Sequence, residues 1–279
     1  KVDLNKGLIS PTTLDYMLAQ QGVQQRFGDI VPASVNLKGT ADVALGYNVG
    51  VLYDINDQWS LGLNYRSKMM LKVAAGTATV SYANDLAKYI LEEKVGLINE
   101  ADFRAEMPCV SVLNFGVSYK PIKSLTLAAD FQLSFWKQYQ DLNIDFLSEK
   151  LQGFNQHILK DYKNSMTYHL GAQWAATNRL DLRAGLMIDT APMHQDCYNP
   201  ETPGMTKIEP SVGLSFRPVK NFAIDFSMLY VAGLGRDNAT CTYEDLLLKA
   251  AGSPNYVKEF TADYKLNAVC PAIGVSFWF

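Results

Sequence analysis

The sequence predicts an all-β protein, a transmembrane antiparallel β-barrel, on three observations. Large apolar residues alternate with small or polar residues along most of the 279 residues. The small and polar face is rich in Gly, Ser, Ala and Asn, whereas a water-facing surface would carry more Lys and Glu. The connections between the alternating segments are short and long in turn, which is typical of an outer-membrane barrel.

The alternation indicates strands because successive side chains of a strand point to opposite faces. In the segment 42–54, Val49, Val51 and Tyr53 share one face, while Asn48 and Gly50 share the other. Each segment approaches the roughly 9–11 residues that a tilted strand needs to cross a bilayer. We count nine such segments: 42–54, 59–68, 110–119, 124–140, 167–174, 179–189, 207–216, 221–230 and 268–279.

The connection lengths predict which end of the barrel faces the cell exterior. Short turns follow Ile55, Tyr119, Trp174 and Phe216, and the long connections are 74–105, 147–163, 190–205 and 236–261. We expect the last strand to run toward the periplasm, with its terminal Phe279 on the lipid face, so that every long connection is extracellular. A closed bacterial barrel has an even number of strands. The count of nine strands therefore predicts further strands upstream. Residues 1–33 are then an extracellular helical loop, and residues 34–279 are the C-terminal strands of the barrel.

The apolar face would meet lipid, and the small and polar face would line the lumen. A soluble sandwich with its apolar face inward is the alternative that the composition of the polar face disfavours. The polar side chains of the lumen could mark a permeation path or could pair across the barrel. The residues expected to point into the lumen are Arg66, Lys68, Asp130, Gln132, His169, Asp181, Arg183 and Asp225.

Two outer segments show helical periodicity. Ser10 or Thr12 could cap a helix in the segment 10–27, and Asn84 could cap a second helix in the segment 84–103. Their apolar residues either pack on each other as a lid or form a groove open to the medium, and the two arrangements are compatible. The candidate ligand-binding residues of this groove are Leu14, Met17, Leu18, Leu86, Tyr89, Ile90, Leu97, Ile98 and Phe103.

Four stretches, "LGYNVGVLYDINDQWSLGLNYRSKM", "LTLAADFQLSFWKQYQDL", "YKNSMTYHLGAQWAATNRLDLRAGLMIDTAPM" and the closing "GVSFWF", resemble the FadL/TodX family of outer-membrane transport proteins. The resemblance covers most of residues 40–279. It implies a fourteen-stranded barrel with an N-terminal hatch that would lie upstream. It also implies passive uptake of long-chain fatty acids or other small hydrophobic compounds, captured between the loops 1–33 and 74–105.

The same resemblance implies the partners. We expect hydrophobic small molecules such as fatty acids as ligands, outer-membrane lipid and lipopolysaccharide as surroundings, and the barrel-assembly machinery during biogenesis. The C-terminal Phe after an alternating strand resembles the signal that this machinery recognises. A surface lipoprotein or another membrane protein is a further candidate partner. The alternative functions are a general porin for polar solutes and a structural or partner-binding surface barrel.

Composition and motifs disfavour nucleic-acid-binding proteins, enzymes and metal-binding proteins. The net charge of −3 offers no basic excess for nucleic acid. We expect no enzyme activity, no cofactor and no metal, because His157, His169 and His194 are not part of a recognisable catalytic or metal-binding motif. Cys197 and Cys241 both fall in predicted outer loops, so a disulfide between them is expected in an oxidising compartment.

Overall fold

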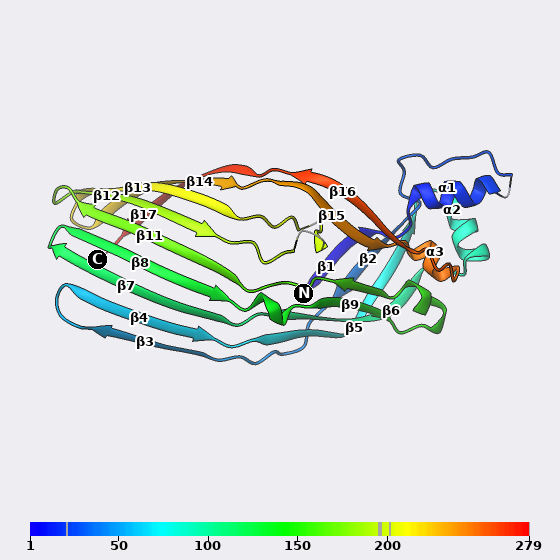
Figure 1. Ribbon diagram of the computed structural model, residues 1–279, viewed down its shortest axis with the longest axis horizontal. Coiled ribbons are helices and arrows are strands. Elements are labelled where there is room, and N and C mark those ends of the chain that lie inside the picture. The colour runs from blue at the N-terminus through cyan, green and yellow to red at the C-terminus, as the bar shows by residue number, and fades with distance from the viewer. Residues whose placement is uncertain (21, 195–196, 201, 279) are drawn as a thin grey trace.

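The structure, a computed structural model, describes residues 1–20, 22–194, 197–200 and 202–278. Its largest element is a nine-stranded antiparallel sheet, as the alternation predicts (Figure 1). The terminal Phe279 lies outside the described residues. In spatial order, the strands are β17 (Asn267–Phe277), β14 (Phe222–Gly233), β13 (Lys207–Val219), β12 (Leu180–Asp189), β11 (Ser165–Ala175), β8 (Leu125–Ser134), β7 (Val112–Ile122), β4 (Trp59–Arg66) and β3 (Asn48–Asp54).

The register of this sheet sorts apolar and polar residues onto opposite faces. Large apolar residues lie side by side across six strands in the row Leu63, Phe115, Phe131, Tyr168, Ile188 and Ile208. The opposite face carries the row Asn64, Asn114, Gln132, Thr167, Asp189 and Lys207.

Exposure runs opposite to that of a soluble sheet. Leu170 on the apolar face is 57% exposed, whereas Asp181 on the polar face is 2% exposed. Apolar side chains therefore face outward, where a barrel meets lipid.

Tight turns join neighbouring strands at one end of the sheet, shown on the left of Figure 1, and the chain's C-terminus lies at that end. These turns are the short connections that the sequence predicts. Two predicted boundaries are wrong. Residues 42–47 precede β3, although Val43 and Leu45 continue its alternation, and the segment 124–140 ends as a strand at Ser134, before a 3₁₀ helix. β3 and β17 are the edge strands of the sheet among the described residues.

Beyond the other end, the long connections contain paired strands, except for 190–205, which has no strand among its described residues. A six-stranded sheet contains β1 (Val2–Gly7), β2 (Ala33–Gly39), β5 (Met69–Tyr82), β6 (Glu100–Cys109), β9 (Asp141–Phe146) and β10 (Gln156–Leu159). A separate pair is β15 (Arg236–Glu244) with β16 (Val257–Tyr264). The hairpin β5–β6 keeps the register of the pair β4–β7 beneath it, because Arg66 faces Val112 and Met69 faces Cys109. Continued pairing keeps the backbone hydrogen-bonded where the chain leaves the barrel.

Short helices complete this outer part of the molecule, which we call the cap and define as residues 1–39, 69–109, 141–160 and 236–264. They are α1 (Pro11–Gln20), α2 (Asp85–Tyr89) followed by a π-helix (Ile90–Lys94), and α3 (Leu246–Ala250). Two 3₁₀ helices span Trp136–Gln138, at the sheet end, and Glu149–Phe154. Among the described residues, no helix is long and apolar enough to cross a membrane.

The predicted caps of two helices are confirmed. Thr13 N–H donates to Ser10 Oγ at 3.4 Å, and Ala87 N–H donates to Asn84 Oδ1 at 2.8 Å. The predicted extent of the second helix is wrong, since helical structure ends at Lys94 and a strand begins at Glu100. In that strand Ala101 and Phe103 are buried while their neighbours are exposed, so a two-residue period outweighs helical spacing there. Residues 1–33 are likewise only partly helical, because β1 pairs with β2 around α1.

The apolar face of the nine-stranded sheet gives a direct test of its surroundings. Leu170→Arg places a charge on the outward face, whereas Gly171→Arg places the same charge inward, where an added Cβ would meet no atom within 4 Å. We expect Leu170→Arg in the full-length protein to lower the free energy of unfolding from lipid bilayers by about 2–4 kcal/mol. Gly171→Arg should change it much less. Urea unfolding in vesicles measures both, and equal losses would contradict the assigned faces.

A candidate ligand site in the extracellular cap

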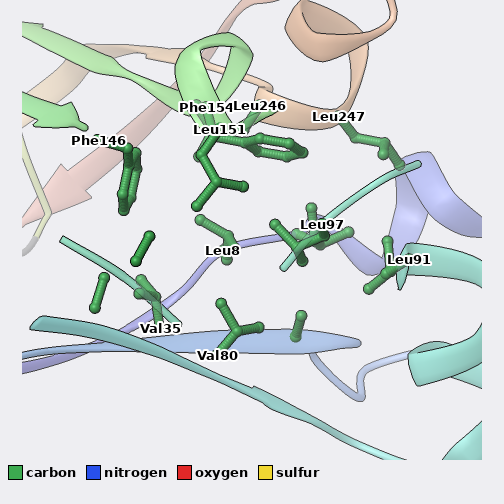
Figure 2. Close-up of a cluster of buried hydrophobic side chains, with 14 of the residues drawn as sticks. Leu8, Val35, Val80, Leu91, Leu97, Phe146, Leu151, Phe154, Leu246 and Leu247 are labelled. Carbon is green, nitrogen blue, oxygen red and sulfur yellow. The ribbon is translucent and has the colours of Figure 1, made fainter. Parts of the chain in front are cut away.

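The predicted groove residues converge in the cap, where they form a packed core. Leu14 and Leu18 of α1 belong to the same buried cluster as Leu97 and Phe103, and each of the four is at most 3% exposed. Figure 2 shows the core that they join, which includes Leu8 after β1, residues of β2 and β5, the helices and residues 146–154. Met17, Leu86, Ile90 and Ile98 pack against this core as partly buried residues, and Tyr89 is exposed. The structure thus has the lid arrangement, and an open groove among these residues stays a prediction.

A cavity that the sequence did not predict lies beside this core. Its volume is about 670 Å³, within the range of small-molecule sites. Six parts of the chain line it: residues 6–10, Val31, residues 156–159 of β10, residues 197–200, residues 241–246, and β16 through Val257 and Phe260. Sequence reasoning missed this cavity because its walls come from segments up to 254 residues apart (Lys6 to Phe260). The sequence feature that could have indicated this cavity is the alternation within residues 257–264, which places large apolar residues outside the membrane sheet.

The acidic groups at this cavity already have partners. Asp245 caps α3 by accepting from Leu247 N–H at 3.1 Å and Leu248 N–H at 3.2 Å, and it also accepts from the Thr13 hydroxyl of α1. Glu244 lies 2.7 Å from Lys249 Nζ, which also donates to the Asn155 carbonyl at 2.7 Å. These contacts link α3 to Thr13 of α1 and to Asn155.

Tyr198, at the same cavity, is a buried phenol with an unsatisfied hydroxyl. Its side chain is 2% exposed, and its hydroxyl oxygen has no hydrogen-bond partner among the described residues. Its ring packs on Tyr264 with centroids 4.4 Å apart. Burial raises the pKa of Tyr198 above its ordinary value, so the phenol stays protonated at physiological pH and can donate a hydrogen bond.

The polar face of the nine-stranded sheet holds side-chain pairs that link different strands. Arg183 lies 3.4 Å from Asp225 and donates to Gln173 at 3.0 Å, and Asp181 pairs with Arg217.

His169 Nδ1 lies 2.6 Å from Asp130 Oδ1, at ion-pair distance but without hydrogen-bond geometry. Arg66, Gln132 and His169 line a second cavity of about 630 Å³, and Lys68 lies exposed between β4 and β5. Their role as lumen-lining groups stays a prediction.

No cluster of three or more His, Cys, Asp or Glu side chains suited to a metal ion occurs among the described residues. Cys197 N–H donates to the His194 carbonyl at 3.4 Å. This local contact is between backbone atoms.

The predicted disulfide between Cys197 and Cys241 gains support from the backbone. Tyr198 N–H donates to the Thr240 carbonyl at 3.0 Å, and both cysteines line the cavity of about 670 Å³. This bond joins the residue that follows Cys197 to the residue that precedes Cys241, so the two segments lie side by side. We propose that the two residues are bridged in the oxidising exterior.

Thiol labelling of the full-length protein tests this bridge. After denaturation without reductant, we expect Cys109 and Cys270 to react with maleimide, and Cys197 and Cys241 to react only after reduction. Reduction should also lower the free energy of unfolding of the cap by about 2–4 kcal/mol. Alkylation of Cys197 and Cys241 before reduction, read by mass spectrometry of the peptides, would exclude the bridge.

The fold defines a class of protein. An antiparallel sheet that is apolar outside and polar inside, with tight turns at one end and a folded cap at the other, is part of an outer-membrane β-barrel.

The model of the family described as outer membrane protein transport protein (OMPP1/FadL/TodX) matches residues 26–279. The chain belongs to this family of outer-membrane transport proteins.

Relatives and solved structures agree with this assignment. Outer membrane protein P1 of Haemophilus influenzae is 26% identical over 244 residues, covering 84% of this chain and 50% of the relative. The chain therefore spans about half the length of the curated relatives it matches. A Pseudomonas aeruginosa FadL homologue superposes with a TM-score of 0.71 at 18% identity, over 88% of this chain and 55% of that one. The Pseudomonas putida toluene transporter TodX gives a TM-score of 0.53 at 15% identity, over all of this chain and 62% of that one. These two structures support the fold.

Proposed function

We propose that the full-length protein is an outer-membrane channel for passive uptake of small hydrophobic compounds, with long-chain fatty acids as its principal substrates. The observation that carries this proposal is the cap, which places an apolar core and an adjoining cavity on a sheet of the family's transport barrel. Uptake of this kind requires binding and diffusion without catalysis.

The physical problem that such a channel solves is the poor passage of apolar molecules through the polar sugar coat of the outer membrane. A water-filled porin offers them no favourable surface. An apolar site outside the membrane does, because each buried CH₂ group contributes about 0.8 kcal/mol. A few polar groups at the same site would then orient a carboxylate.

The rest of the barrel follows from the same proposal. The outer edges of β3 and β17 would pair with the remaining strands of the whole protein, because unpaired backbone groups in hydrocarbon cost several kcal/mol each. The outward face would contact membrane lipid and, in the outer leaflet, lipopolysaccharide. The barrel-assembly machinery would insert the chain.

Uptake by whole cells tests the proposal. We expect deletion of the full-length gene to lower uptake of labelled palmitate several-fold, complementation to restore it, and uptake of a polar sugar to be unchanged. Toluene is measured in parallel, because a structural relative is a toluene transporter.

Loss of sugar uptake instead of palmitate uptake would favour a general porin. No change in any uptake would contradict a transport role and favour a partner-binding barrel.

The predicted groove is tested on α2 and the π-helix that follows it. Leu86→Ser with Ile90→Ser alters two half-buried residues of the cap core, and Lys88→Ser alters the exposed side of the same helix. We expect the double variant to lower palmitate uptake several-fold at equal surface expression, because it weakens the apolar surface. Lys88→Ser should behave like the wild type. Equal uptake by both variants would remove these residues from the ligand path.

A further inference from the structure

We propose that the outward face of the nine-stranded sheet binds one anionic phospholipid of the periplasmic leaflet. Its acyl chain would lie in a hollow over β8, β11 and β12, and its phosphate would lie at Lys123 and Arg179. The proposal goes beyond the proposed function, because it concerns the membrane-facing wall of the barrel rather than the path of a transported compound.

The first support is a hollow of about 590 Å³ in the lipid-facing wall. The outside of a barrel is convex, so a hollow there requires neighbouring side chains of unequal size. Ala129 of β8, Ala172 of β11 and Ala184 of β12 line it, and these three strands are neighbours in the sheet (Figure 1). The register places the three alanines on the apolar outward face. The large side chains around them are Trp59, Tyr119, Leu127, Leu170 and Leu186.

The place of the hollow in the membrane identifies what fills it. Leu170 at its edge is exposed on the face that meets lipid, so hydrocarbon is the medium outside. An empty hollow would forfeit the dispersion contacts of its walls, and an acyl chain restores them. The rings of Trp59 and Tyr119 stack with centroids 4.2 Å apart, which gives the chain a flat wall on one side.

The second support is the positive charge of the two turns at the near end of these strands. Lys123 lies between β7 and β8, Arg179 lies between β11 and β12, and both are exposed. The turns are neighbours, because Ala175 N–H donates to the Ser124 carbonyl at 2.8 Å. Among the described residues, neither cationic side chain has an ion-pair partner. An anionic head group would supply that partner.

Acidic residues do not neutralise this pair of turns. Asp57 is the acidic residue of the tight turns, and it lies between β3 and β4, two strands away from β8. Asp181, near Arg179 in sequence, is buried on the polar face and pairs with Arg217. The charge that faces a lipid head group at these turns is therefore positive.

The distance from the turns to the hollow suits one leaflet. Arg179 and Ala184 are five residues apart, which is roughly 17 Å along an extended strand. A strand tilt of about 40° reduces this to about 13 Å along the membrane normal, less than half of the roughly 30 Å hydrocarbon core. Short turns of such barrels face the periplasm, where the leaflet consists of phospholipid rather than lipopolysaccharide.

Native mass spectrometry of the full-length protein in detergent micelles tests the head group. The probes are dipalmitoyl phosphatidylglycerol and dipalmitoyl phosphatidylethanolamine, which share their acyl chains. We expect the first phosphatidylglycerol to bind about tenfold more tightly, because two cations meet its net negative charge. Lys123→Gln with Arg179→Gln should remove this preference. The matched control is Lys88→Gln, an exposed cation of the cap, which should keep it.

A second pair of variants tests the hollow. Ala172→Leu with Ala184→Leu fills it while the outward face stays apolar, so we expect a folded barrel that binds both lipids several-fold more weakly. Val212→Leu enlarges the outward residue that pairs with Ala184 but lies outside the hollow. This matched control should bind both lipids like the wild type.

Three results would overturn the proposal. Equal affinity of the wild-type protein for the two lipids would exclude an anionic head group, and an unchanged preference in the glutamine variant would exclude Lys123 and Arg179. Wild-type lipid affinity in the leucine variant would exclude the hollow. A second copy of the chain is the other occupant: dimers that the leucine variant abolishes while lipid binding persists would make the hollow an interface between copies.

Discussion

Within the hydrocarbon of a bilayer, every backbone N–H and C=O group must find its hydrogen-bond partner inside the protein, because no water is present to replace it. The nine-stranded sheet meets this constraint by continuous antiparallel pairing from β3 to β17. Because the strands supply the backbone partners, the side chains can be arranged by environment, with apolar ones toward lipid and polar ones toward the interior. Apolar residues such as Leu63 and Leu170 face outward, and polar residues such as Asp181 are buried within.

The cap buries its apolar side chains, as a water-facing domain does. The change from outward-facing to buried apolar side chains occurs where β4 and β7 continue into β5 and β6. The register of β4 with β7 continues into β5 with β6, yet Val73 and Phe103 now point into a buried core. Gly76 stands at the register shift of this hairpin, and a Cβ there would collide with the Phe103 ring. One extended hairpin thus serves as a membrane wall below and as a core element above.

The sequence was sufficient for the membrane sheet because a period of two is specific when one face is small or polar and the other is bulky. It was less informative for residues 42–47, where Val43 and Leu45 alternate like a strand but precede β3. It was misleading at residues 98–103, where apolar spacing fits a helix and the pairing of Phe103 with Phe146 makes a strand. It could not show the cavity, because Lys6, Leu159, Tyr198 and Phe260 meet only through the tertiary fold.

The most direct test of the account is a spin-label scan of β11 in the full-length protein, reconstituted in lipid bilayers from a cysteine-free background. A label is placed at each residue from Thr167 to Trp174 in turn, and its collisions with oxygen and with a water-soluble nickel complex are measured. The account predicts oxygen maxima at Tyr168, Leu170, Ala172 and Trp174, with the remaining positions shielded from lipid. Oxygen maxima at the intervening positions, or accessibility without a two-residue period, would contradict a sheet whose apolar face meets lipid.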